Sequence, residues 1–223
     1  MNRRGSSARN TRLLAGKPRL RNRRPAQARP TAGYRSRGTS GRELHEAFNA
    51  PETWYEPNGK SRIRYVREPA GTGFYHPVTL DEVRERIAEL PAHLTRMLEV
   101  VQLSGITRKR TIFPCYGMQW GSTVYLYPIE ESLTECYVRP PGPQQLIEAR
   151  MYGGRWLQDR EDWRLEWTKE TIRDYYLHNI LIHEIGHIND ERNTKFAARE
   201  KYADWFAVEY GYRPWRRKCQ ARG

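Results

Sequence analysis

The whole net charge of this chain lies in its first 42 residues. This segment holds thirteen Lys and Arg side chains and no Asp or Glu, whereas the remaining 181 residues carry equal numbers of basic and acidic side chains. Arg is mixed there with Gly, Ser, Pro and Asn, and Tyr34 is the only aromatic residue. Because such a segment has too few apolar side chains to offset the entropy lost on ordering, we predict that residues 1–42 form a disordered basic tail. A packed fold must therefore come from the rest of the chain.

The charge of this tail predicts an attraction to nucleic acid or another polyanion, and that attraction would weaken steeply with salt. A solvated arm that only keeps the protein in solution is the alternative interpretation. Nothing in residues 1–42 indicates that individual bases are read. An Arg-rich start without acidic residues is also typical of an organellar transit peptide, although its apolar residues show no amphipathic period.

The cysteines and the hydropathy pattern indicate the cellular compartment in which the protein is expected. Cys115, Cys136 and Cys219 are odd in number and form no CxxC pair, which argues against a disulfide scaffold and favours a reducing compartment. No apolar run approaches the length of a transmembrane helix, and the start of the chain lacks the apolar core of a secretory signal. We therefore expect a cytoplasmic protein without a membrane partner, with organellar import as the alternative.

Hydrophobic periodicity predicts a helix, several strands and then two helices in residues 43–212. The segment from Thr79 to Glu82 has the spacing of a capping box, so a helix is expected from there to about Leu90. Alternating or β-branched runs predict strands at residues 62–67, 99–103, 123–127, 134–138 and 163–167. This order indicates an α+β domain with a small antiparallel or mixed sheet, followed by a short basic tail at residues 213–223.

The two C-terminal helices have the clearest pattern. Thr168 suits an N-cap, and Gly186 is the only helix breaker between it and about Asn189. Apolar residues recur there every three or four positions, which predicts one continuous buried face. A loop at residues 190–194 and a second helix over residues 195–210, ended by Gly211, are expected to follow.

Residues 183–187, within the first of these helices, read His-Glu-Ile-Gly-His. Since residues four apart lie on one helical face, His183 and His187 can bind one ion, and zinc suits neutral nitrogen ligands. Glu184 lies about 100° around the helix axis from His183, so its carboxylate can reach a zinc-activated water without binding the ion. An accidental pair of surface histidines is the alternative, and the buried face of the helix argues against it. The pattern predicts a zinc site with Glu184 as general base.

Two histidines need a third protein ligand. In the second helix Glu200 and Asp204 are four residues apart and share a face with Ala203. Two helices joined by a short loop pack antiparallel, which brings this face against the two histidines. A carboxylate on a face of small residues is costly unless it binds a metal or another partner. Both acidic side chains are therefore candidates for the third ligand.

The two segments resemble the gluzincin branch of the zincin metallopeptidases, in which a His-Glu-x-x-His helix is followed by a helix carrying Glu-x-x-Ala-Asp. The resemblance implies a zincin-like fold with zinc as its cofactor. Carried over to this chain, it implies the ligands His183, His187 and Glu200, the base Glu184, and Asp204 as the hydrogen-bond partner of a ligating histidine. Because Glu200 follows His187 more closely than in many of these families, Asp204 as the ligand in its place stays open. The metzincin branch is disfavoured, because Asp190 and Asn193 stand where its Gly and third His would be.

This resemblance implies a zinc-dependent metallopeptidase that hydrolyses a protein or peptide substrate. In such enzymes an edge strand beside the active-site helix holds an extended substrate, and residues 123–127 are the candidate here, with an ordinary core strand as the alternative. The competing function is a zincin-like regulatory or nucleic-acid-associated binding protein that uses the basic tail. An accidental motif in a structural protein is a third possibility. The presence of Glu184 favours the enzyme, since a site kept only for structure needs no general base.

Overall fold

The computed structural model describes residues 53, 55–56, 59, 62–107, 115–137, 139–159 and 162–221. The predicted disordered tail at residues 1–42 lies outside these residues. The described chain combines small sheets with helices, so the expected α+β class is confirmed. Within the described part, no helix has both the length and the apolarity needed to cross a membrane.

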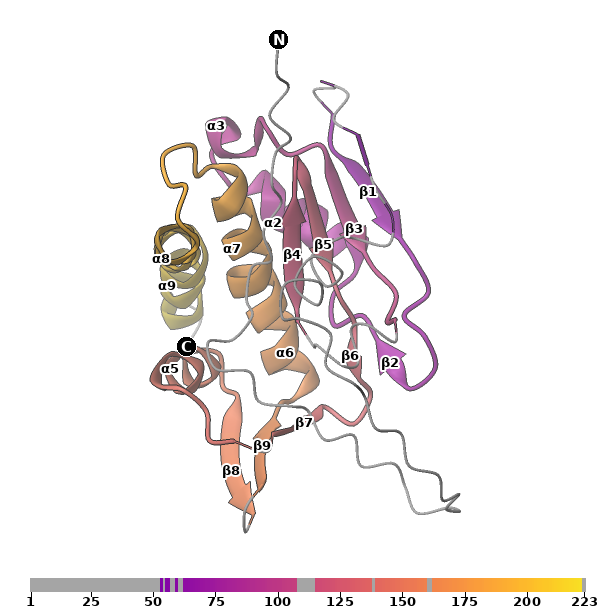
Figure 1. The fold of residues 1–223 in the computed structure, drawn as a ribbon, viewed down its shortest axis with the longest axis vertical. Helices are drawn as coiled ribbons and strands as arrows, with labels where there is room; N and C mark the ends of the chain where they lie inside the picture. Colours follow the sequence, from indigo (N-terminus) through magenta and orange to yellow (C-terminus); the bar gives the residue numbers. More distant parts are fainter. Residues whose placement is uncertain are drawn as a thin grey trace, which may run out of the picture.

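The central sheet has four strands in the order β1-β3-β5-β4. β1 (Arg64–Arg67), β3 (Val100–Leu103) and β5 (Thr123–Leu126) are parallel, and β4 (Gly117–Trp120) pairs antiparallel with β5 (Figure 1). Every residue of β3 and β5 is buried, as expected for strands covered on both faces. Of the two interpretations of residues 123–127, the ordinary core strand is therefore confirmed and the substrate-binding edge strand is wrong. β5 lies inside the sheet, and β4 is the edge strand next to the C-terminal helices.

Two smaller sheets are antiparallel. β2 (Phe74–Tyr75) pairs with β6 (Ile129–Glu130). The other sheet has the order β7-β9-β8, formed by β7 (Thr134–Tyr137), β9 (Asp162–Glu166) and β8 (Arg155–Asp159). Helix α5 (Pro143–Met151) connects β7 to β8.

The N-terminal half contributes helix α2 (Leu80–Ala88) and the short helix α3 (Ala92–Thr95). The predicted capping box at the start of α2 is confirmed: the Thr79 hydroxyl accepts from the Glu82 backbone at 3.2 Å, and the Thr79 backbone donates to the Glu82 carboxylate at 2.8 Å. Each bond satisfies a backbone donor that the helix itself leaves unpaired.

The first long C-terminal helix is continuous and is made of α6 (Lys169–Tyr175), the π-helical segment η1 (Tyr176–Ile180) and α7 (Leu181–Ile188). It begins at the predicted N-cap, where the Thr168 side chain accepts from the backbone of Thr171. The second consists of α8 (Phe196–Phe206), π-helical η2 (Ala207–Tyr212) and α9 (Arg213–Ala221).

The expected end of the second helix at Gly211 is wrong, because Gly211 lies inside η2 and the helix continues through the basic residues that follow. Gly211 serves packing instead of termination. A Cβ atom at this position would lie 1.9 Å from the backbone oxygen of His178. The missing side chain therefore allows η2 to approach η1.

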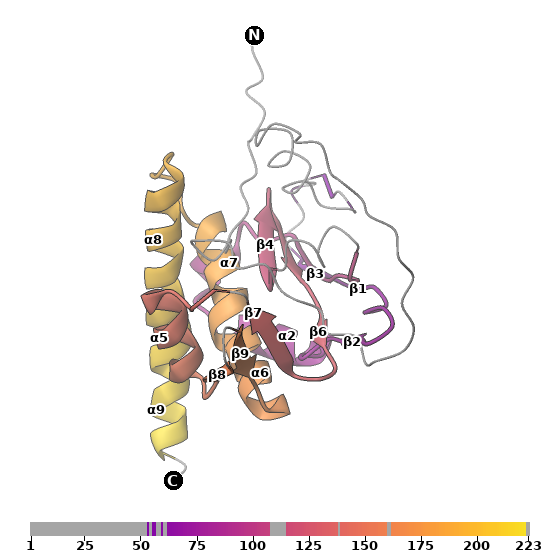
Figure 2. The same ribbon diagram turned by 60° about the horizontal axis from the view of Figure 1, so that its bottom comes forward.

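The two long helices form the antiparallel pair that was expected, and the first lies between the second and the sheet (Figure 2). A Cβ atom at Gly186 of α7 would lie 3.0 Å from Cβ of Phe206 and 3.2 Å from Cα of Ala203, both on α8. The missing side chain of Gly186 thus permits a close approach of the two helices. It brings the histidine face of α7 directly against α8.

Candidate metal centre

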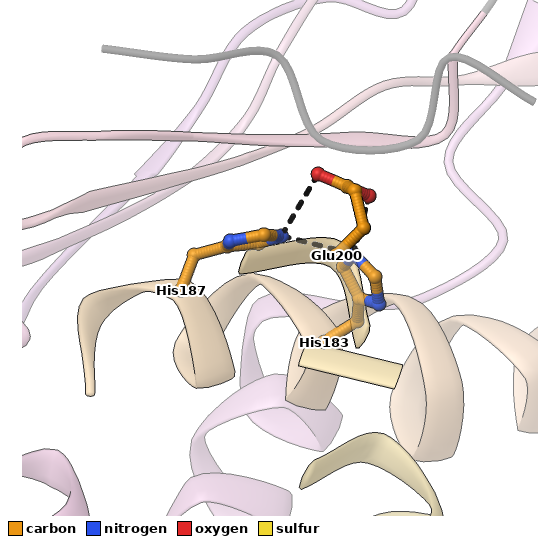
Figure 3. Close-up of side chains that lie close together, drawn as sticks. All are labelled: His183, His187 and Glu200. Atoms are coloured by element: carbon orange, nitrogen blue, oxygen red, sulfur yellow. Dashed lines mark hydrogen bonds and ion pairs between the residues drawn. The ribbon is translucent and has the colours of Figure 1, made fainter. Parts of the chain in front are cut away.

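His183 and His187 lie one turn apart on α7, and both are buried. Their rings point to the same side of the helix, and their Nε2 atoms are 3.0 Å apart (Figure 3). The four-residue spacing produces this geometry because it places the two side chains on one helical face. Two imidazole nitrogens that meet in this way can share a single ion.

Glu200 reaches the same point from α8 (Figure 3). Its Oε2 atom lies 3.6 Å from Nε2 of His183, and its Oε1 atom lies 3.6 Å from Nε2 of His187. One atom from each of the three side chains lies within 4.8 Å of the others, so the group could hold a metal ion. Oε1 of Glu200 is buried and accepts no hydrogen bond from the described residues. A bound cation would give this oxygen a partner.

The separations of these atoms suit an ion of the size of zinc. Tetrahedral ligands placed about 2.0–2.1 Å from zinc lie about 3.3 Å from one another. The two nitrogens are 3.0 Å apart, and each lies 3.6 Å from a different oxygen of Glu200. One atom from each side chain lies within 4.8 Å of the others, so the side chains must draw closer together to bind one ion.

Asp204 lies one turn beyond Glu200 and contacts the other nitrogen of His183. Its Oδ1 atom is 3.1 Å from Nδ1. A carboxylate this close to Nδ1 favours a proton on that nitrogen, which leaves the lone pair on Nε2, facing His187 and Glu200. Asp204 therefore favours the tautomer that a ligand needs. Of the two carboxylates that the sequence left open, Glu200 is the one that faces both Nε2 atoms.

Glu184 is fully buried and is not a member of the three-residue group. Its side chain lies against the edge strand β4, where a Cβ atom at Gly117 would be 2.8 Å from Oε1 of Glu184. The backbone of β4 thus passes directly beside this carboxylate, and only glycine leaves room for it. The Glu184 carboxylate therefore packs against the sheet and stays outside the three-residue group.

The turn between α7 and α8 is held by hydrogen bonds of the Arg199, Asp190 and Asn193 side chains. The Arg199 guanidinium donates to the backbone oxygens of His187 at 3.1 Å and Asp190 at 3.2 Å. Oδ1 of Asp190 in turn accepts from the backbone and side-chain nitrogens of Asn193, at 3.1 Å and 2.9 Å. These bonds satisfy carbonyls at the end of α7 and shorten the connection. Arg199 lies in the first turn of α8, so no local sequence signal pointed to its contact with the end of α7.

Two further polar side chains of the first helix, those of Tyr176 and His178, make contacts away from the metal-ligand group. The Tyr176 hydroxyl donates to the backbone oxygen of Tyr127 at 2.8 Å in the core. Nδ1 of His178 accepts from Nε of Arg86 at 3.0 Å. Burial, together with the Arg86 charge, lowers the pKa of His178 to about 3. Both side chains are thus engaged away from the metal-ligand group.

Comparisons of the chain with protein-family models, with curated proteins and with solved structures found no match.

Proposed function

We propose that this chain is a zinc-dependent metallopeptidase of the zincin type, similar to the gluzincins. In this proposal His183, His187 and Glu200 hold the ion, and Glu184 is the general base. One observation carries it: three ligand atoms from two helices converge, and a second carboxylate, that of the adjacent Glu184, is buried without joining the group. Three protein ligands leave a position for water or substrate, as in catalytic zinc sites, whereas structural sites are closed by four.

The chemistry follows from these positions. A zinc ion bound here would polarise the scissile carbonyl and lower the pKa of a water molecule. Glu184 accepts a proton from the attacking water and delivers it to the nitrogen of the leaving amine. Asp204 keeps Nδ1 of His183 protonated, so that Nε2 remains available to the ion.

The edge strand favours a peptide as the substrate. β4 is the last strand of the central sheet on the side of α7, and no other described strand pairs with its outer edge. An extended peptide can bind such an edge through main-chain hydrogen bonds. Because β4 passes Glu184 at Gly117, a peptide bound there would present a bond beside the base.

Zinc content and peptide cleavage, measured on the same preparations, test the proposal. We expect about one zinc per chain in the wild type and in Glu184→Gln, since Glu184 is not a ligand. Cleavage of a mixed peptide library, followed by mass spectrometry, should fall about 10²- to 10⁴-fold in Glu184→Gln. Glu191→Gln makes the same change at an exposed position after α7 and should cleave like the wild type.

Activity that survives in Glu184→Gln would contradict the assigned base. A wild-type protein that binds zinc and cleaves no member of the library would instead favour a binding or regulatory role.

A further inference from the structure

Asp204 has a second partner on the side away from His183. Nε2 of Gln144, on helix α5, donates to Oδ2 of Asp204 at 2.5 Å, while Oδ1 of the same carboxylate faces His183. One carboxylate thus connects α5 to the metal-ligand group. Gln144 lies 60 residues before Asp204 in the chain, and both views of the fold place α5 beside α8.

The amide of Gln144 is itself held in a fixed orientation. Its Nε2 atom also donates to Oε1 of Glu148, one turn further along α5, at 3.0 Å. An amide NH₂ group has two hydrogens, so it can give one to each of the two carboxylates. Oε2 of Glu148 accepts from the Tyr175 hydroxyl at 3.4 Å, which ties this arrangement to α6.

Asp204 needs such support because it is partly open to solvent. Its side chain is 28% exposed, whereas that of His183 is fully buried. It lines a pocket of about 270 Å³ between α5 and the helix pair, together with Gln144, Glu148 and Val208. Water in this pocket can compete for the carboxylate and allow it to rotate away from the imidazole. A hydrogen bond that holds Oδ2 also fixes the direction of Oδ1.

We propose that Gln144 is a positioning residue of the metal centre. It holds the Asp204 carboxylate in the orientation in which Oδ1 faces Nδ1 of His183, and it thereby keeps the Nε2 lone pair directed at the ion. This inference rests on the proposed zinc site. It adds a residue outside the two motif helices on which that site depends.

A double-mutant cycle on zinc affinity tests this role. Zinc dissociation constants would be measured by chelator competition for the wild type, Gln144→Leu, Asp204→Ala and the double variant. We expect Gln144→Leu to bind roughly three- to tenfold more weakly, because one partly exposed hydrogen bond is lost. Asp204→Ala should bind about 10- to 100-fold more weakly. Because Gln144 acts through Asp204, the double variant should bind like Asp204→Ala alone.

Gln220→Leu is the matched control, since it makes the same change at an exposed position of α9. It should bind zinc like the wild type. Gln144 is also exposed, so Gln144→Leu should fold normally, and thermal melts of the metal-free proteins would verify this.

Two results would overturn the inference while leaving the zinc site intact: unchanged affinity in Gln144→Leu, or full additivity of the two substitutions. Additivity would mean that Gln144 acts independently of Asp204. A wild-type protein that binds no zinc would overturn the proposed function itself, and this inference with it.

Discussion

Glu200 follows His187 by only 13 residues, yet its Oε1 atom lies 3.6 Å from Nε2 of that histidine. The tight turn at the end of α7 makes this possible. Arg199 binds two carbonyls of that turn, and Gly186 lets α8 approach α7 at the level of Ala203. The short spacing is therefore compatible with a third ligand on α8.

This arrangement predicts an order of zinc affinities. Glu200→Ala removes a ligand, whereas Asp204→Ala removes only the support of one. We expect Glu200→Ala to weaken zinc binding by more than about 100-fold, beyond the loss typical of a supporting carboxylate. Chelator competition would measure the zinc dissociation constants of both variants, with Glu191→Ala as the exposed control. A larger loss in Asp204→Ala would assign Asp204 to the metal instead.

The helix pair could be predicted from the sequence because its signals are local. Thr168 marks the start of the first helix, and the spacing of His183 and His187 fixes their common face whatever the rest of the chain does. The proximity of Glu200 followed from one further assumption, namely that two helices joined by a short loop pack antiparallel.

The edge strand could not be predicted in this way. Residues 117–120 read Gly-Met-Gln-Trp, a run that contains no β-branched residue and is too short for its alternation to stand out. They form a strand because β5 supplies hydrogen bonds on one side and α7 packs close by. The predicted helix end at Gly211 was wrong for a related reason. Glycine often ends a helix, but it also allows two segments to approach closely, and only the position of His178 in the fold shows which role Gly211 has.

The contact between β4 and the base leads to a second prediction. In Gly117→Ala the new Cβ atom would lie 2.7 Å from Cγ2 of Ile180 and 2.8 Å from Oε1 of Glu184, so strand or carboxylate must move. We expect peptide cleavage to fall by about 100-fold, as for a displaced catalytic group, with zinc content unchanged. Gly142→Ala is the control, because its Cβ atom would meet nothing closer than 3.5 Å. Full activity in Gly117→Ala would show that Glu184 does not depend on this contact.

His178 should make the fold sensitive to acid. Burial, then the charge of Arg86, lowers the pKa of His178 from 6.5 to about 3 in the folded chain. A lowered pKa means that the fold favours neutral imidazole. The resulting stability is complete above pH 6.5 and is lost, by about 1.4 kcal/mol per pH unit, as the pH falls from there toward 3. The Arg86 guanidinium, which donates to Nδ1 of His178, adds to the cost of protonation.

Urea unfolding of His178→Gln at several pH values would measure this effect. The amide oxygen of glutamine can still accept from Arg86, but it does not titrate. Between pH 6.5 and 5 the variant should therefore lose less stability than the wild type. If the free energy of unfolding changed with pH equally in the variant and the wild type, the pKa of His178 would not be lowered by the fold.

Glu135 should have the opposite effect at higher pH. This carboxyl is buried on β7 and accepts hydrogen bonds from the hydroxyls of Tyr116 and of Tyr137, the latter at 3.3 Å. Burial raises the pKa of Glu135 from 4.5 to about 7, although these hydrogen bonds act in the other direction. Since the folded chain prefers the protonated acid, its contribution to stability is present below pH 4.5 and is lost as the pH rises through 7.

Glu135→Gln tests the direction of this pH dependence, because glutamine keeps an oxygen acceptor for the two tyrosines and cannot ionise. Relative to the wild type, the variant should gain stability as the pH rises from 4.5 to 8, by up to about 3 kcal/mol, since each unit of pKa shift corresponds to about 1.4 kcal/mol. Urea unfolding at pH 5, 6, 7 and 8 measures the difference. Glu166→Gln, on the adjacent strand β9, is the control and should show no such trend. A stability difference between Glu135→Gln and the wild type that stays constant over this range would mean that Glu135 is already ionised at pH 5, held so by the tyrosine hydroxyls against the cost of burial.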